Sequence, residues 1–173
     1  PIQTDWRLNE RHYGALQGLD KRETVAQHGE EQVLKWRRGF SIRPPAMALD
    51  DPEQSTNHPR YRGLGNMPDT ESLADTLIRV TRWWHEALVP LLTQKKRVLV
   101  VAHGNSLRAL VKYIDNMSEE DILDFNIPTG IPLIYKLDNQ LSPRSRDYLA
   151  DSEKLSLAIN EIKNQVTQDK HQN

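Results

Sequence analysis

Three short groups of residues carry side chains that could do chemistry, and the first is Glu10-Arg11-His12-Tyr13. A carboxylate in such a loop can act as a general acid or base if partial burial raises its pKa towards neutrality. The alternative is a surface ion pair between Glu10 and the adjacent Arg11, which would carry no function. The residue types and their spacing leave both readings open.

The second group is basic and consists of Lys21 and the adjacent pair Arg37-Arg38. Guanidinium groups grip phosphate or carboxylate through two parallel hydrogen bonds, and a lysine adds a point charge. These residues could therefore bind an anion. A solvated basic face of a helix explains them equally well, because nothing in the spacing separates the two readings.

The third group, His103-Gly104-Asn105, ends the apolar run Arg97–Ala102. Consecutive apolar residues rich in β-branched types predict a strand buried on both faces. Gly104 then permits a sharp turn, and Asn105 with Ser106 can cap the helix that follows. A histidine at the carboxyl end of a buried parallel strand lies where α/β proteins bind anions. The alternative is a histidine whose hydrogen bonds are only structural.

Composition narrows the class of protein. A chain of 173 residues is long enough for one ordinary domain with its own core. The net charge of -1, from 23 basic and 24 acidic residues, argues against a protein that binds nucleic acid or a membrane surface. There is no cysteine, no HExxH spacing, no membrane-length apolar run and no signal-peptide pattern. We therefore expect a soluble, cytoplasmic protein without a metal site.

Helical and strand-like segments alternate along the chain. Strands are predicted at 2–8, 97–102, 133–137 and 145–149, the last two forming a pair. Helices are predicted from the cap Asp20 to Ala26, over Glu30–Arg38, over Glu71–Leu92 from a cap at Asp69 or Thr70, after Gly104, and from Ser118 paired with Asp121. This alternation predicts an α/β fold, a three-layer α/β/α arrangement with a largely parallel sheet and flanking helices.

Two segments depart from this pattern. Residues 1–150 are expected to form a single domain, but 41–68 within them contain five prolines and no apolar periodicity. An irregular stretch of that length is usually a functional lid, a disordered segment or a solvated surface insertion. Residues 151–173 are polar and weakly helical, and we interpret them as a C-terminal tail.

Five blocks of sequence, taken together, point to a family. They are LNERHYGALQGLDK (Leu8–Lys21), KWRRGF (Lys35–Phe40), TESLADTLIRV (Thr70–Val80), VVAHGNSLRALVKY (Val100–Tyr113) and NIPTGIPLIY (Asn126–Tyr135). In this order and with these spacings they resemble the cofactor-dependent phosphoglycerate mutases of the histidine phosphatase superfamily. The resemblance extends from about Trp6 to Leu149, and five blocks in register are far more specific than one tripeptide.

The resemblance implies roles for single residues. Glu10 matches the position of the proton donor and acceptor. His103 matches the second active-site histidine, which stabilises the phosphoryl group during transfer. The irregular segment 41–68 matches a cover that limits the access of water to the active site. The positions that match substrate-binding residues are Arg11, His12, Tyr13, Lys21, Arg37, Arg38, Gly104 and Asn105.

The resemblance also implies a reaction, the interconversion of 3-phosphoglycerate and 2-phosphoglycerate in glycolysis and gluconeogenesis. It proceeds through a phosphohistidine, needs 2,3-bisphosphoglycerate as cofactor and uses no metal. The expected partners are small phosphoglycerates and further copies of the chain, in a homodimer or homotetramer, with no nucleic acid and no membrane.

One part of the family pattern is missing. The phosphorylated histidine of these mutases lies in an Arg-His-Gly motif, and this sequence contains none. We therefore expect a chain that is N-terminally incomplete, lacks a central strand beside Arg97–Ala102, and is inactive by itself. Two alternatives remain open: a histidine-type phosphatase of broad specificity, and a truncated, non-catalytic fragment that binds phosphoglycerates. The coding sequence upstream of Pro1 would distinguish among them.

Overall fold

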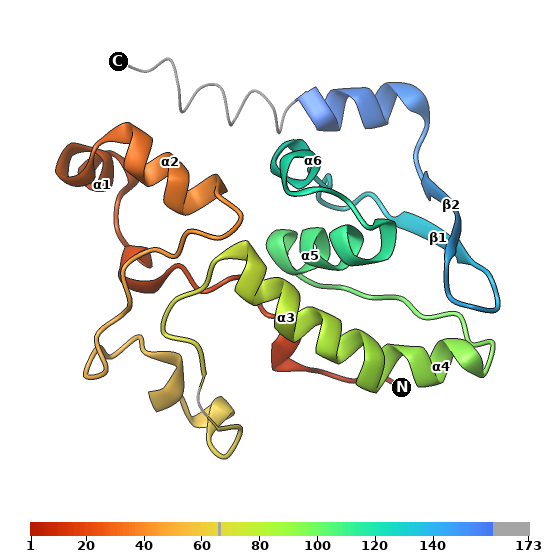
Figure 1. Cartoon of the computed structure of the whole chain (residues 1–173), viewed down its shortest axis with the longest axis horizontal. Coiled ribbons are helices and arrows are strands. Elements are labelled where there is room, and N and C mark those ends of the chain that lie inside the picture. Colours follow the sequence, from red (N-terminus) through yellow and green to blue (C-terminus); the bar gives the residue numbers. More distant parts are fainter. Residues whose placement is uncertain (66, 161–173) are drawn as a thin grey trace.

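Two helices that lie side by side, α3 and α5, form the centre of the fold (Figure 1). The computed structural model describes residues 1–65 and 67–160. Its helices are α1 (Lys21–His28), α2 (Glu30–Arg38), α3 (Leu73–Trp83), α4 (Val89–Thr93), α5 (Gly104–Asp115) and α6 (Glu119–Asp124), and its strands are β1 (Leu133–Leu137) and β2 (Pro143–Tyr148). Residues 152–160 are also helical. Residues 161–173, the rest of the expected tail, lie outside the described residues.

The core forms where the apolar stripe of α3 meets that of α5. Val80 of α3, Ala109 of α5 and Ile122 of α6 are completely buried in one cluster. Ser72 begins α3 with a capping box, because its side chain accepts from the Asp75 N–H while the Asp75 carboxylate accepts from the Ser72 N–H. The cap is thus Ser72 rather than the predicted Asp69 or Thr70, since Ser72 is the residue whose side chain reaches a free N–H of the first turn.

The long helix predicted for Glu71–Leu92 changes its hydrogen-bonding pattern partway. The chain forms a π-helical turn over Trp84–Leu88 and then continues as α4, which holds Pro90 in its first turn. Proline has no N–H, and its ring collides with the carbonyl four residues earlier, which here belongs to Glu86 inside the π-helical turn. Pro90 therefore alters the helix in front of it rather than ending it.

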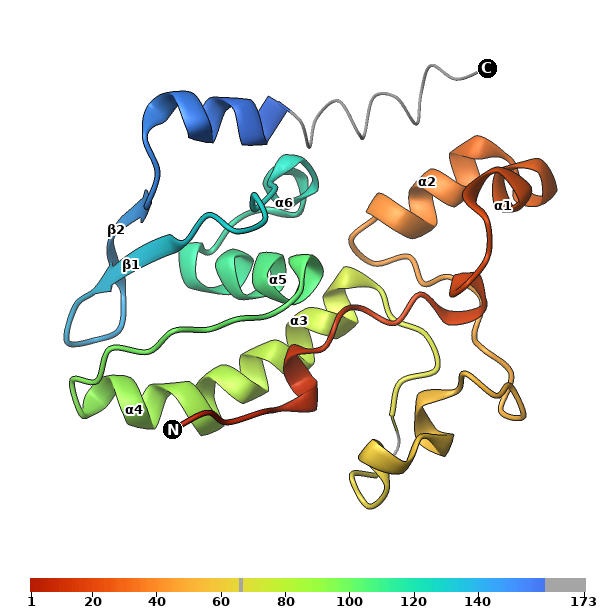
Figure 2. The same cartoon turned by 180° about the vertical axis from the view of Figure 1, so that it is seen from behind.

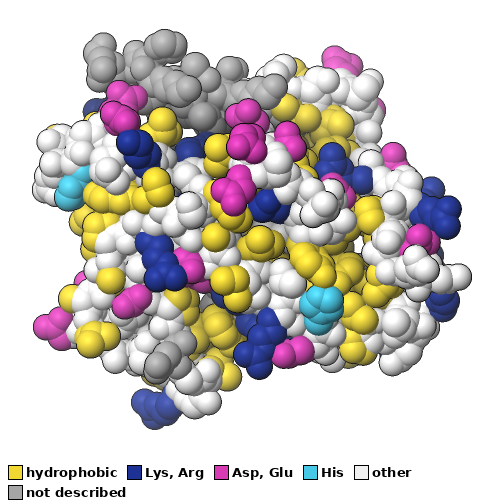
Figure 3. Space-filling model, in the orientation of Figure 1, with side chains coloured by type: hydrophobic (Ala, Val, Ile, Leu, Met, Phe, Trp, Pro, Cys, Tyr) yellow, Lys and Arg dark blue, Asp and Glu magenta, His cyan; other side chains and the backbone are white. Residues whose placement is uncertain are grey.

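The expected parallel sheet does not form among the described residues. Their sheet is the antiparallel hairpin β1–β2, in which Leu133 lies opposite Tyr148, so the predicted strand pair is confirmed. The run Arg97–Ala102 is extended but belongs to no strand, and the prediction that both its faces are buried is wrong: Leu99 is 80% and Val101 82% exposed. A parallel strand needs a neighbouring strand, and the described residues supply none beside this run. Figure 3 shows hydrophobic side chains open to solvent on the face of the molecule that is seen in Figure 1.

The predicted N-terminal strand is also absent. Trp6–Leu8 form a short 3₁₀-helix, and residues 1–5 have no regular structure. The Asp5 carboxylate accepts hydrogen bonds from both the backbone N–H and the guanidinium of Arg7. Such local bonds between a side chain and nearby backbone compete with a strand ladder, and here they fold the segment into a turn.

The caps of α1 and α6 were predicted correctly, whereas the cap of α5, like that of α3, was not. Asp20 caps α1 by accepting from the N–H groups of Arg22 and Glu23, and Ser118 caps α6 by accepting from the Asp121 N–H, both as expected. The cap of α5 is His103, which makes no side-chain capping bond, so the predicted cap at Asn105 and Ser106 is wrong. Ser106 lies inside the first turn and donates to the carbonyl of Leu8 instead.

The irregular segment 41–68 is packed against the rest of the protein. It contains short 3₁₀-helices at Ser55–Asn57 and Pro59–Tyr61 and buries Met47, Gln54 and Met67. Its entrance and exit lie together, because Thr70 Oγ1 donates to the carbonyl of Pro44. Seen from behind, the segment forms one lobe below α1 and α2 (Figure 2). A wholly solvated insertion would not make these contacts.

Gly14 joins this lobe to the loop of the first sequence group. Its φ is +58°, and a Cβ added to it would lie 2.0 Å from the carbonyl oxygen of Pro45. We expect Gly14→Ala to destabilise the protein by about 2 kcal/mol or more, from backbone strain plus displacement of Pro45. Urea unfolding measures the effect. Gly18→Ala is the control, because Gly18 has a φ of +75° with no atom near its added Cβ. Equal losses in both variants would mean that the contact with Pro45 has no importance.

Candidate active site

A buried ion pair fixes the backbone around Glu10. Arg79 Nε lies 2.6 Å from Glu71 Oε1, and Arg79 Nη2 lies 2.9 Å from Glu71 Oε2. Only 3% of Glu71 and 8% of Arg79 is exposed. The same guanidinium donates to the carbonyls of Arg7, Asn9 and Glu10 at 2.6, 3.0 and 3.2 Å.

Glu71 holds the other end of the same loop. The His12 N–H donates to Glu71 Oε2 over 2.9 Å, and the Glu71 N–H donates to the His12 carbonyl over 2.8 Å. The two residues therefore fasten the backbone on both sides of Glu10, and they leave its side chain outside the ion pair. Sequence reasoning missed them as site residues. The sequence did hold a signal for Arg79. Arg79 lies at helical spacing from Thr76 and Trp83, so it shares their face of the helix, and that face is buried.

Glu10 is half-buried beside the beginning of α5. A Cβ added to Gly104 would lie 3.9 Å from Glu10 Oε2, so the carboxylate lies close to the first helical residue after His103. Glu10 Oε1 accepts from the Arg11 N–H at 2.7 Å. The Arg11 guanidinium turns to the carbonyls of Trp36 and Arg37, both at 3.0 Å, so within the described residues it forms no ion pair with Glu10. The ion pair considered as the alternative for Glu10 therefore does not form, and the role of Glu10 in proton transfer stays a prediction.

Arginines from different parts of the chain surround Tyr13. The Arg11 guanidinium carbon lies 4.4 Å from the centre of the Tyr13 ring, and that of Arg37 lies 5.6 Å from it. The Tyr13 hydroxyl accepts from Asn105 Nδ2 at 3.0 Å, and Asn105 Oδ1 accepts from Arg108 Nη1 at 3.0 Å. The first, second and third sequence groups thus meet in one place.

Arg108 was not among the residues selected from the sequence. It is 7% exposed, and in this cluster only Arg11, at 2%, is a more deeply buried cation. Burial, followed by the positive charges of Arg38 and Arg11, lowers the pKa of its guanidinium to about 10, and Tyr13 and Glu10 oppose the shift. Arg108 is still charged at neutral pH. Its signal in the sequence was a cation at helical spacing from the apolar residues of α5, on the face that packs on the core.

Several buried donors in the cluster have no partner. The Nε atoms of Arg11, Arg37 and Arg108 are buried, and none makes a hydrogen bond within the described part of the chain. An unsatisfied buried donor on a charged group costs free energy, and three of them lie in this one region. A phosphate or carboxylate group has the charge and the acceptor oxygens that they lack.

His12, His103 and Lys21 stand in different positions. The His12 ring is buried, its Nδ1 accepts from the Gly14 N–H, and burial lowers its pKa while Glu71 and Asp69 oppose the shift. It faces the ion pair, and its expected contact with substrate stays a prediction. His103 is exposed at the start of α5. Lys21 is the first residue of α1, and its side chain lies outside the described part of the structure.

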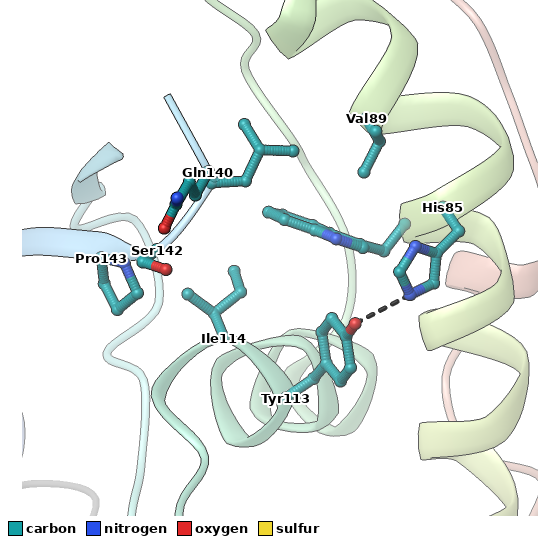
Figure 4. A pocket seen from close by; sticks show the side chains of 9 residues that line it. His85, Val89, Tyr113, Ile114, Gln140, Ser142 and Pro143 are labelled. Atoms are coloured by element: carbon teal, nitrogen blue, oxygen red, sulfur yellow. Dashed lines mark hydrogen bonds between the residues drawn. The ribbon is translucent and has the colours of Figure 1, made fainter. Parts of the chain in front are cut away.

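A cavity of about 350 Å³ lies elsewhere, between the π-helical turn, α5 and the turn of the β1–β2 hairpin (Figure 4). Trp84, His85 and Tyr113 are among its lining residues, and the Tyr113 hydroxyl is 2.7 Å from His85 Nε2. None of the predicted site residues lines it, and neither does any arginine, lysine or carboxylate. It therefore lacks the charges that a phosphate site needs.

Neither a metal-binding cluster nor a helix able to span a membrane is found among the described residues. Within 1–65 and 67–160, no three His, Asp or Glu side chains come close enough together to hold a metal ion. None of the helices in this part of the protein has both the length and the apolar character needed to cross a bilayer.

Comparison with known families gives the decisive observation. Residues 46–140, more than half of the chain, match the histidine phosphatase superfamily (branch 1). The chain belongs to this superfamily. Histidine phosphatases are α/β proteins, and their superfamily includes both phosphatases and mutases.

The histidine phosphatase match covers only part of the site described above. Glu71, Arg79, His103, Asn105 and Arg108 lie inside the matched residues, whereas Glu10–Tyr13 and Arg37-Arg38 precede them. The fold joins the two parts through the contacts of Arg79 with the Glu10 loop and of Asn105 with Tyr13. The candidate site is therefore built from both the matched region and the residues before it.

The Glu71–Arg79 pair can be tested by mutation. We expect Arg79→Met to destabilise the protein by about 3–5 kcal/mol, because it leaves a buried carboxylate and three backbone carbonyls without their donor. Arg82→Met, on the same helix but 72% exposed in its side chain, is the control and is expected to leave the urea midpoint almost unchanged. If both variants unfolded at similar urea concentrations, the ion pair would not hold the loop as described.

Proposed function

We propose that this histidine phosphatase takes part in the interconversion of 3-phosphoglycerate and 2-phosphoglycerate. The observation that carries the proposal is the cluster of buried, unpartnered arginine Nε atoms beside a half-buried carboxylate at the start of a helix. Such a site offers anion binding and proton transfer within one small region. Substrates that carry a phosphate, a carboxylate and a free hydroxyl require that combination.

The proposal gives each group a task. Arg11, Arg37 and Arg38 hold the phosphate and carboxylate groups of a phosphoglycerate. Glu10 would take the proton from the free hydroxyl as that oxygen bonds to phosphorus and the bond from phosphorus to the phosphohistidine nitrogen breaks. It would give a proton to the substrate oxygen that leaves when the other phosphate returns to that histidine. His103, beside the N–H groups at the start of α5, stabilises the charge on the phosphoryl group in flight.

The three unpartnered donors also fit 2,3-bisphosphoglycerate, whose two phosphates and carboxylate are acceptors only. When bound, this cofactor supplies the phosphoryl group that primes the enzyme. The histidine that receives it belongs, by the family pattern, to an Arg-His-Gly motif, which these 173 residues do not contain. We therefore propose that this chain binds phosphoglycerates by itself and requires such a histidine for turnover. A strand beside Arg97–Ala102 would also complete the expected three-layer α/β/α fold.

A phosphatase of broad specificity is the second candidate. One observation favours the mutase, namely the attachment of segment 41–68 to both ends of the Glu10 loop. The Asn9 side chain donates to the Tyr61 hydroxyl, and the Ala15 N–H donates to the Pro45 carbonyl. A cover beside the site would exclude water, which a mutase must keep from the phosphohistidine and a phosphatase must admit, and this attachment supports such a role for segment 41–68.

Ligand selectivity distinguishes the two candidates. We expect 3-phosphoglycerate to bind this chain at least about tenfold more tightly than p-nitrophenyl phosphate, since the carboxylate adds a second charged contact. Isothermal titration calorimetry measures both affinities. Equal affinities would favour the phosphatase, and the absence of binding by either ester would overturn the anion site.

Two substitutions separate binding from proton transfer. Arg38→Ala is expected to weaken binding of 3-phosphoglycerate by about tenfold or more, because it removes a charged donor. Glu10→Gln keeps the shape of the side chain and is expected to retain or slightly improve binding, since it removes a negative charge beside an anion. In an enzyme that also carries the Arg-His-Gly histidine, Glu10→Gln is expected to lower kcat by about 10²–10⁴-fold. Near-normal turnover would remove Glu10 from its role.

A further inference from the structure

A chain of hydrogen bonds leads from the interior of the protein to the anion site. Arg108 Nη2 donates to the carbonyl of Ile122 at the inner end. Arg108 Nη1 donates to Asn105 Oδ1 at 3.0 Å, and Asn105 Nδ2 donates to the Tyr13 hydroxyl at 3.0 Å. The chain thus connects α6, α5 and the Glu10 loop.

The direction of this chain is fixed at Arg108. A guanidinium has only donors, so the Asn105 atom that faces it must be the carbonyl oxygen Oδ1. The amide NH₂ of Asn105 therefore faces Tyr13, whose hydroxyl oxygen must accept. The hydroxyl hydrogen of Tyr13 is left over, and no acceptor among the described residues takes it.

The cost of burying Arg108 suggests that its charge has a purpose. Only 7% of Arg108 is exposed, and none of the carboxylates described in the structure forms an ion pair with it. The positive charges of Arg38 and Arg11 repel it, and the negative charge of Glu10 offsets part of this repulsion. The bond to Ile122 accounts for Nη2 as a structural link to α6, whereas Nη1 is directed to Asn105 and so towards Tyr13.

We infer that Arg108 is a positioning residue that holds Asn105 in one orientation and thereby directs the Tyr13 hydroxyl to donate to an anionic oxygen of the substrate. This inference rests on the proposed function, because it names one further determinant of the same anion site. Without Arg108, the Asn105 amide can rotate by half a turn, accept the hydroxyl hydrogen of Tyr13 and remove a donor from the ligand.

A double-mutant cycle on the full chain tests this inference, with calorimetric affinity for 3-phosphoglycerate as the readout. Tyr13→Phe removes only the hydroxyl and is expected to weaken binding about tenfold, the usual effect of one hydrogen bond to a charged group. Arg108→Met is expected to weaken it to a similar degree. If Arg108 acts through Tyr13, the double variant binds about as weakly as the weaker single variant, because the second change has nothing left to remove.

Two further variants serve as controls. Arg108→Lys keeps a donor-only cation and is expected to restore part of the affinity that Arg108→Met loses. Arg144→Met removes the same charge from a side chain that is 74% exposed on β2 and is expected to leave affinity unchanged. Circular dichroism of each variant reports whether it is folded.

Each outcome decides one point. Wild-type affinity in Arg108→Met, or losses that multiply to about a hundredfold in the double variant, would overturn the inference while leaving the anion site intact. If the wild-type chain bound neither 3-phosphoglycerate nor inorganic phosphate, the proposed function itself would fail. Non-additive losses together with rescue by Arg108→Lys would support the positioning role.

Discussion

The bidentate ion pair between Glu71 and Arg79 is the interaction on which the candidate site depends. A buried ion pair is a weak source of net stability, since desolvation of both charges offsets most of their attraction. Its value here is geometric. One guanidinium gathers three carbonyl groups from the loop Arg7–Glu10, and one carboxylate holds the backbone of His12 from the other side. A loop with little regular structure thereby acquires a defined shape next to α3.

The rest of the site follows from that constraint. With its backbone fixed, the loop presents Glu10 to the start of α5 and Tyr13 to Asn105. Arg37, at the end of α2, reaches the same tyrosine ring from another side. Positive charge is therefore concentrated where hydrogen-bond donors remain unused, and neither property would arise from any one of the three segments by itself. Ser106 adds a further link, because its hydroxyl donates to the carbonyl of Leu8.

Local features could be predicted from the sequence because their causes are local. Asp20 and Ser118 cap helices through N–H groups two or three residues away, and the hairpin forms between neighbouring strands. Arg97–Ala102 misled the prediction, because a run of apolar residues indicates a strand but does not supply its partner. Glu71, Arg79 and Arg108 were missed because their meaning depends on distant backbone groups: each reads as an ordinary helix charge until its contacts are known. The pairing of Glu10 with Arg11 is the opposite case, since adjacency in sequence suggested an ion pair that the fold replaces with contacts to α2.

The extended run Arg97–Ala102 has a consequence for the histidine at its end. In the described part of the chain, the main-chain N–H and C=O groups of this run make no hydrogen bonds, whereas α5, which follows directly, is a regular helix packed on the core. His103 therefore stands at the junction between a segment open to amide hydrogen exchange and one protected from it. Pairing of a strand with this run would order the backbone next to His103. It would change α5 little, because α5 is already ordered. The position of His103 would therefore depend on whether a strand is paired with this run.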